Sequence, residues 1–265
     1  MRTDAWTQAV RNQLALGRLL PLGGREDGAW ITEQAAVRAL GRAAAEIPGV
    51  RLGTLRIGPV PLESVSEPAV PAPASALPPG PLRIEAAFTA SLGQPLPEAA
   101  DQLRSALLHA AAERLGLATA TADLRISDLH EGPDEGPDES PDESPNTEVT
   151  SRAATRDMRP APEGTAARSS HPVAGKGSGQ GPVGEIADVA AGVPGVARLT
   201  AVLGSRPVRL HDQVDPPGRH VEIHFAVAPG HHPLHVARAV RKAVAAAAAG
   251  DTTGPVTVAV LITET

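Results

Sequence analysis

The feature that most constrains the fold of this sequence is an internal repeat. Residues 83–88 (Arg-Ile-Glu-Ala-Ala-Phe) align with residues 220–225 (His-Val-Glu-Ile-His-Phe) at an offset of 137 positions, and the same offset aligns residues 103–107 with 240–244 without a gap. Two segments with the same alternation of apolar and polar residues are expected to form the same local structure. We therefore expect two small domains of one type rather than a single large one.

The first copy, within residues 25–130, has the pattern helix, strand, strand, helix, strand. Thr32 can cap the first helix, Pro48-Gly49 ends it, and Pro97 lies in the first turn of the second helix. The strands are predicted at residues 50–57, 82–90 and 122–126, and the middle one alternates strictly between apolar and polar residues. The residues that recur at helical spacing are Ala36, Leu40, Ala44 and Ile47 in the first helix, and Ala100, Leu103, Leu107 and Ala110 in the second.

The second copy, residues 183–265, repeats this order. Its predicted elements are a helix at 186–193, strands at 197–203 and 221–227, a helix at 233–249 and a last strand at 256–262. The fold class is therefore α+β, with two copies of a small antiparallel or mixed sheet, each covered on one face by two helices and open to solvent on the other. Each copy is small enough to be only marginally stable alone, so we expect the two copies to pair.

The remaining segments differ in composition from the copies. Residues 131–182 are mostly Pro, Gly, Ser, Thr and charged residues, with almost no large aliphatic side chain. Such a segment buries too little apolar surface to compensate for the conformational entropy that it would lose on folding. We predict a disordered linker there, with an acidic docking tail as the alternative. A Pro-rich stretch at 59–81 is expected to be a surface loop of the first domain. Residues 1–24 are predicted as an amphipathic helix that docks on the first domain or, alternatively, lies on a membrane surface.

Composition excludes several classes of protein. The net charge is −6, which argues against nucleic-acid binding, and the absence of cysteine excludes disulfides, thiolate metal sites and a cysteine nucleophile. The N-terminus lacks the apolar core of a secretory signal, and the longest apolar run, residues 243–249, is far too short to span a bilayer. We expect a cytoplasmic protein without a membrane span, and leave peripheral membrane association open.

Several short motifs resemble those of one known family. Residues 31–37 and 45–50 (Ile-Thr-Glu-Gln-Ala-Ala-Val and Ala-Glu-Ile-Pro-Gly-Val) resemble the opening helix of the bacterial alkaline-shock / general-stress envelope protein family. Residues 83–88 and 93–104 resemble the strand, glycine turn and Pro-Glu helix of that family, and residues 123–127 resemble its closing strand. The resemblance covers residues 29–129 and, more weakly, 183–265.

This resemblance carries functional expectations. It implies a non-enzymatic cytoplasmic protein that is linked to cell-envelope stress, is sometimes tethered to the membrane through a partner, and can self-associate. The tandem divergent copies, with their Ala/Pro/Arg-rich bias, also resemble a set of uncharacterised actinobacterial proteins, some of which carry a nucleopolyhedrovirus P-ten label. We attach no viral function to that label.

Six of the nine histidines lie between residues 211 and 235, and four of them are considered as metal ligands. His231 and His235 are four residues apart at a helix start, and His220 and His224 are expected on the solvent-facing side of a strand. Zinc accepts such nitrogens, but the sequence has no cysteine and no His-Glu-x-x-His motif. We therefore predict no metal site and take these four histidines as surface residues.

The sequence contains no recognisable set of nucleophile, base and oxyanion-stabilising groups, so we predict no catalytic residue, no cofactor and no enzyme activity. We expect a structural or interaction protein that binds a protein partner, associates with itself, or does both. The alternative is a His-rich regulatory protein that binds a small ligand or a metal.

Overall fold

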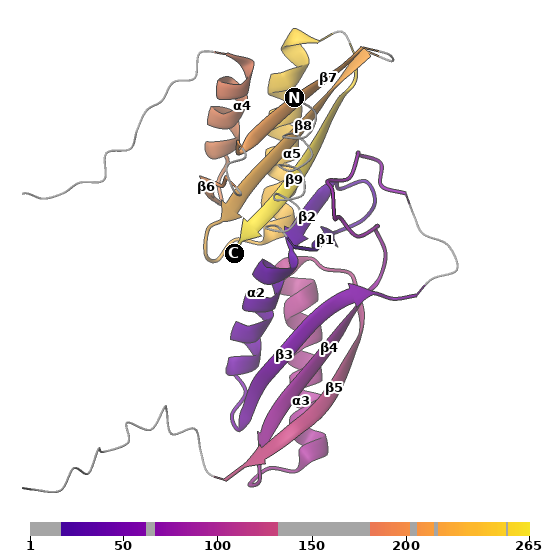
Figure 1. Ribbon diagram of the computed structural model, residues 1–265. Coiled ribbons are helices and arrows are strands. Elements are labelled where there is room, and N and C mark those ends of the chain that lie inside the picture. Colours follow the sequence, from indigo (N-terminus) through magenta and orange to yellow (C-terminus); the bar gives the residue numbers. More distant parts are fainter. Residues whose placement is uncertain (1–16, 62–66, 132–180, 202–205, 215–216, 253) are drawn as a thin grey trace, which may run out of the picture. The chain divides into compact units, whose positions relative to one another are not determined.

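The computed structural model describes residues 17–61, 67–131, 181–201, 206–214, 217–252 and 254–265. These residues form a mixed α+β structure with two sheets and four α-helices (Figure 1). Most of the helix predicted at 1–24 and nearly all of the linker predicted at 131–182 lie outside the described residues.

The first half of the chain forms a three-stranded sheet, which consists of β3 (Val50–Pro59), β4 (Leu82–Ser91) and β5 (Thr119–His130). β3 and β4 are antiparallel, whereas β4 and β5 are parallel. The helices α2 (Glu33–Ala45) and α3 (Leu96–His109) contribute to the same hydrophobic core as the strands. A π-helical turn, Ala110–Leu115, continues α3.

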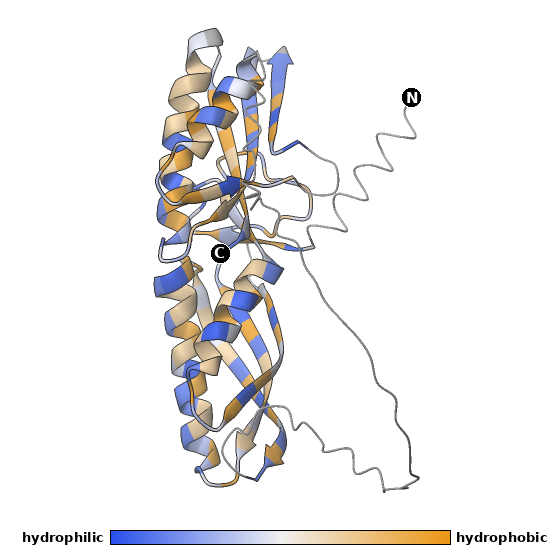
Figure 2. Ribbon diagram, turned by 90° about the vertical axis from the view of Figure 1, so that its left-hand side faces the viewer, coloured by the Kyte–Doolittle hydropathy of each residue, from blue (hydrophilic) through white to orange (hydrophobic). Residues whose placement is uncertain are grey.

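The sequence pattern explains these elements. The side chains of Leu82, Ile84, Ala86 and Phe88 are buried, while the residues that alternate with them are half-buried or exposed, so β4 has one apolar and one polar face. Figure 2 shows hydrophobic and hydrophilic residues following one another along the strands. Thr32 caps α2 by accepting a hydrogen bond from the Ala35 backbone N–H at 3.3 Å. The π-helical turn ends at Gly116, whose φ of +83° suits glycine. The helices and strands predicted for the first copy are thus confirmed.

The second half contributes four strands and two helices. The strands are β6 (Val196–Leu199), β7 (Val208–Val214), β8 (Pro217–Val227) and β9 (Val256–Glu264), and the helices are α4 (Pro182–Ala191) and α5 (Pro233–Ala248), followed by the 3₁₀ turn Ala249–Asp251. β6 and β7 both pair antiparallel with β8, and β9 pairs parallel with it. The strand β7 was not predicted from the sequence.

Two strands from the first half complete this second sheet and make it six-stranded. β1 (Leu19–Leu22) pairs antiparallel with β2 (Ala29–Thr32), and β2 pairs parallel with β9. Residues 19–22 were predicted to lie in an amphipathic helix, and that prediction was wrong. Their four side chains are all buried, which an extended segment inside a sheet achieves and a half-exposed helix does not.

The six-stranded sheet is apolar on both faces over part of its area. Besides the main core, a second cluster consists of Leu19, Trp30, Val70, Ala259 and Leu261. Val70 comes from the Pro-rich segment, which is tied to the sheet by backbone hydrogen bonds from Leu77 to Leu19 and from Ala69 to Arg25. The expectation that one face of each sheet is open to solvent is therefore wrong for the six-stranded sheet, because part of the segment 59–81 packs on it.

Candidate functional site

His224 is buried, contrary to the prediction that it lies on the surface. Its exposed fraction is 1%, and its Nε2 donates a 2.6 Å hydrogen bond to Glu222 Oε1. The reason is the second apolar cluster, because Leu261 of that cluster lies beside His224 in the register of β8 and β9. His224 Nδ1 has no hydrogen-bond partner among the described residues.

Glu222 is the charged partner of this buried imidazole. Burial by itself would raise the pKa of its carboxyl, but the hydrogen bond from His224 and the nearby His224 and Arg209 charges outweigh that effect and leave the pKa below its usual value. Arg209 Nη1 lies 3.7 Å from the same carboxylate oxygen. His224 is buried, whereas Glu222 and Arg209 are partly exposed, so solvent reaches this cluster only at its Glu222 and Arg209 end.

His220, on the same face of β8, is half-buried. Its Nδ1 lies 2.9 Å from Thr257 Oγ1, its ring stacks on that of His211 at 6.5 Å between centroids, and burial lowers its pKa. His220 and His224 are thus on one face, as predicted, but each has its own partners.

The candidate ligands His231 and His235 have different partners in the structure. His235 stacks on His232, with 4.3 Å between ring centroids, while His231 precedes α5 and has its Nδ1 3.4 Å from the Pro229 carbonyl oxygen. In the part of the chain that the structure describes, no three His, Asp or Glu side chains gather as a metal site would require.

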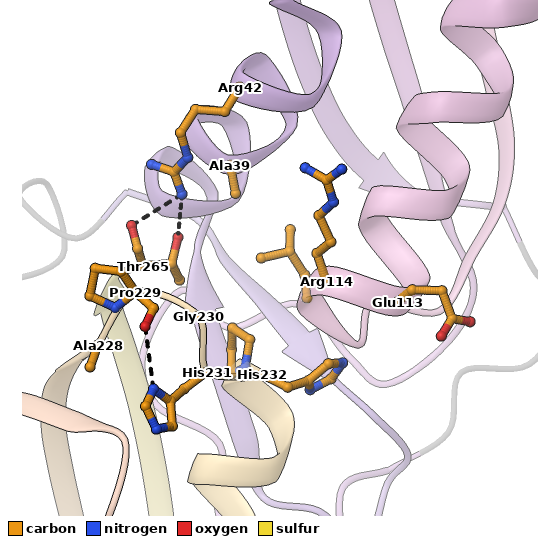
Figure 3. Close-up of a pocket in the computed structure, with 12 residues that line it drawn as sticks. Ala39, Arg42, Glu113, Arg114, Ala228, Pro229, Gly230, His231, His232 and Thr265 are labelled. Carbon is orange, nitrogen blue, oxygen red and sulfur yellow. Dashed lines mark hydrogen bonds between the residues drawn. The ribbon is translucent and has the colours of Figure 1, made fainter. Parts of the chain in front are cut away.

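His231 and His232 instead line a pocket of about 570 Å³ (Figure 3). Arg42 of α2 and Arg114 of the π-helical turn contribute two guanidinium groups to its wall, while the Glu113 carboxylate is turned away from the other labelled side chains. Arg42 donates to the Thr265 carbonyl oxygen at 3.2 Å, and Arg114 forms two hydrogen bonds of 2.8 and 3.0 Å with Glu46.

The pocket also holds the N-terminus of α5, a helix of 16 residues. No side chain caps it and no acidic residue lies in its first turn. The positive end of a helix dipole, together with cationic and imidazole groups, favours an anion. Burial lowers the pKa of His232, so this imidazole is less often charged at neutral pH than an exposed one.

A second feature of functional interest is the edge of the three-stranded sheet. β5 is an edge strand of 12 residues, and no other strand of the described residues pairs along its outer side. Ile126 and Leu129 point toward the core face but are 38% and 40% exposed, and Leu92, whose backbone N–H binds the His130 carbonyl, is 55% exposed. Large apolar side chains along an open sheet edge are typical of a place where another chain adds.

The corresponding edge in the second half is closed. Arg104 Nε donates to the Ala122 carbonyl oxygen at 3.3 Å, and Arg241, its counterpart at offset 137, donates to the Val258 carbonyl oxygen at 3.1 Å. Beyond Val258, the strand β9 pairs with β2 at residues 260–262. The sequence repeat placed these arginines at equivalent positions, but it gave no signal that one edge is covered and the other is open.

Comparison of the chain with protein-family models, curated proteins and solved structures finds no match. No helix among the described residues has the length and apolar character needed to cross a membrane.

Proposed function

We propose that this chain is a non-enzymatic interaction protein that binds a protein partner along the outer edge of β5. The observation that carries the proposal is the contrast between two edges: β9 is covered by β2, whereas β5 carries exposed Ile126 and Leu129 and, among the described residues, has no strand along the side that faces away from β4. An extended segment added to such an edge gains main-chain hydrogen bonds and apolar contacts together.

The proposal includes the view that the two halves are divergent copies of one unit. Three observations support it: the sequence repeat, the shared order of antiparallel then parallel strand pairs, and the matching hydrogen bonds of Arg104 and Arg241. In this view β3 corresponds to β6 and β7 together, since both of those strands pair with β8.

The sequence before each first helix explains why one edge is open. Residues 29–32 (Ala-Trp-Ile-Thr) precede α2 and form the strand that covers β9. The corresponding residues before α4 are 178–181 (Ser-Gly-Gln-Gly), which have no apolar side chain and poor strand propensity. The second half therefore lacks a sequence signal for a strand that would cover β5, and we propose that the covering strand comes from elsewhere.

The resemblance to the alkaline-shock / general-stress envelope family adds the physiological part of the proposal. We place the protein in the cytoplasm, in a response to cell-envelope stress, with any membrane association made through its partner. These points depend on the resemblance alone.

The test is an affinity capture from soluble and membrane fractions with three baits. The baits are the wild-type chain, the chain with Ile126→Asp and Leu129→Asp, and a control with Val189→Asp, because Val189 is also an exposed apolar residue but lies on α4. We expect specific partners that the edge variant loses and the control keeps. Equal capture by all three baits would contradict a docking role for β5.

A second candidate function, binding of a small anionic ligand, is favoured by the pocket in Figure 3. Its volume suits a small molecule. The guanidinium groups of Arg42 and Arg114 and the imidazoles of His231 and His232 line it beside an uncapped helix N-terminus, together with Glu113 and Thr265. Calorimetric titration with inorganic phosphate and with a set of aliphatic and aromatic carboxylates tests it, with Arg42→Gln as the variant that should weaken binding. Absence of heat with every probe would remove this candidate.

A further inference from the structure

We infer that the partner at the β5 edge is a second copy of this chain, with the two β5 strands antiparallel and centred on Leu124. The inference rests on the proposed function of β5 as a docking edge and specifies its occupant. What points to a second copy is the order of charges along β5. In one antiparallel register, each charged residue between positions 120 and 127 of one β5 strand lies opposite a residue of opposite charge in the other.

Around its centre, β5 reads Ala122-Asp123-Leu124-Arg125-Ile126. When two such strands run antiparallel about a two-fold axis at Leu124, Asp123 of each chain lies opposite Arg125 of the other. Opposite charges directly across two antiparallel strands stabilise the pair, and like charges destabilise it. The register therefore forms two ion pairs by symmetry.

The neighbouring symmetric registers are unfavourable. A two-fold axis at Asp123 places two aspartates opposite each other, and an axis at Arg125 does the same with two arginines. Because the strand has no other charged residue between 120 and 127, these two residues decide the register. Both are exposed, so neither has to leave a buried position to meet the partner.

The apolar side chains agree with the same register. Ala122, Leu124 and Ile126 point to the core side of the sheet, because they lie beside Ile84, Ala86 and Phe88 of β4. In the pairing centred on Leu124, Ile126 of each chain lies opposite Ala122 of the other, and the two Leu124 side chains meet at the axis. On each side of the axis, the large side chain of Ile126 therefore packs beside the small side chain of Ala122 from the other chain. This contact covers Ile126, which is exposed in the single chain.

The place of this pairing overlaps the place where the molecule already adds a strand, and it extends to Ala122, whose carbonyl oxygen also accepts a hydrogen bond from Arg104. By the correspondence of Ala122 with Val258, residues 124–126 of β5 are the counterparts of residues 260–262 of β9, which pair with β2. The joined sheet would have six strands, and its two-fold symmetry gives a closed dimer rather than an open chain of subunits.

Two charge variants of the full chain test the inference. Asp123→Arg and Arg125→Asp each replace both attractive pairs of the dimer by repulsive ones, while Arg38→Asp on α2 is a control that changes an exposed arginine in the same way away from the edge. Sedimentation equilibrium at low salt should show a concentration-dependent dimer for the wild type and the control. Each single variant should dissociate about tenfold or more readily.

Mixing the two single variants provides the decisive result. One chain then has two basic residues at the edge and the other has two acidic ones, so we expect a heterodimer although neither variant dimerises well alone. The double variant Asp123→Arg/Arg125→Asp should likewise regain the wild-type dimer. Failure of both rescues, or a wild-type chain that remains monomeric at every concentration, would overturn the inference.

These outcomes are separable from failure of the proposed function. If the wild type is monomeric and the Ile126→Asp/Leu129→Asp bait still loses a captured protein, the edge binds a different chain and only the self-pairing is wrong. If the wild type is monomeric and the capture does not depend on the edge, both the pairing and the docking role fail.

Discussion

Arg104 of α3 donates a hydrogen bond from Nε to the backbone carbonyl oxygen of Ala122 in β5, at 3.3 Å. The arginine thus joins a helix to the open edge strand of its sheet. Arg241 does the same for Val258 and, through Nη1, also donates to the Glu26 carbonyl oxygen at 2.8 Å. Arg104 therefore has one backbone carbonyl partner, at an edge along which no further strand of the described residues pairs, whereas Arg241 has two beside the edge that β2 covers.

This difference predicts unequal effects of one substitution. Replacing either arginine by Met keeps most of the aliphatic stem and removes the hydrogen bonds. We expect Arg104→Met to lower the free energy of unfolding by about 1 kcal/mol and Arg241→Met by about 2 kcal/mol, since the second leaves two carbonyl groups without a donor. Urea unfolding of both variants measures this, and an equal loss in the two would contradict the account.

The contact between Asp27 and Arg238 predicts a dependence of stability on pH. Arg238 donates two hydrogen bonds of 2.7 and 3.0 Å to the Asp27 carboxylate, and this contact holds the pKa of Asp27 below its ordinary value of 3.8. A carboxyl whose pKa is lower in the folded state stabilises the fold above its unfolded pKa and loses that contribution as the pH falls through its folded pKa.

We therefore expect Asp27→Asn to be less stable than the wild type by about 1–2 kcal/mol at pH 7, with the gap closing below about pH 4. Thermal unfolding of both chains between pH 7 and pH 2.5 measures the gap. A constant difference over that range would show that the charge of Asp27 contributes nothing.

Trp30 provides a prediction about the joining of the two halves. It belongs to β2 in the first half, yet its side chain is 1% exposed and packs with Leu261 of β9 in the second half. Trp30→Ala should cost about 3–5 kcal/mol and should speed amide hydrogen exchange in β9. Leu92→Ala, a change at a residue that is 55% exposed, should cost less than about 0.5 kcal/mol.

The buried pair of His224 and Glu222 predicts a non-additive pair of substitutions. His224→Leu leaves the Glu222 carboxylate without its 2.6 Å donor and should cost about 1–3 kcal/mol. Adding Glu222→Gln to that variant should recover part of the loss, because it removes the carboxylate charge that has lost its imidazole donor. A double-mutant cycle by chemical denaturation gives the coupling free energy, and additive effects would contradict a coupled pair.

Most of the local structure of this protein could be predicted from its sequence, because apolar periodicity and caps are local signals. The alternation along residues 82–90 and the helix cap at Thr32 led directly to β4 and α2. The assignment of strands to sheets could not be predicted in the same way. Residues 29–31 are a short apolar run whose partner, β9, lies more than 200 residues away in the sequence.

The histidine predictions show the same limit. Alternation along β8 correctly separated His220 and His224 from the core-facing Val221 and Ile223, but the depth of burial depends on what covers the other face. Trp30 and Val70 provide that cover from distant parts of the chain. The start of α5 at residue 233 was predicted correctly, and it leaves His231 ahead of the helix with the Pro229 carbonyl as its contact, while His235 stacks on His232.

The most direct test of the central claim is amide hydrogen exchange of β5 at several protein concentrations. We expect amides within residues 121–127 to exchange more slowly as the concentration rises, while those of residues 260–262 in β9, already paired with β2, do not change. The slowing should disappear in Arg125→Asp and return when that chain is mixed with Asp123→Arg. Exchange in β5 that is independent of concentration and unaffected by these substitutions would contradict the claim that this edge pairs with a second copy of the chain.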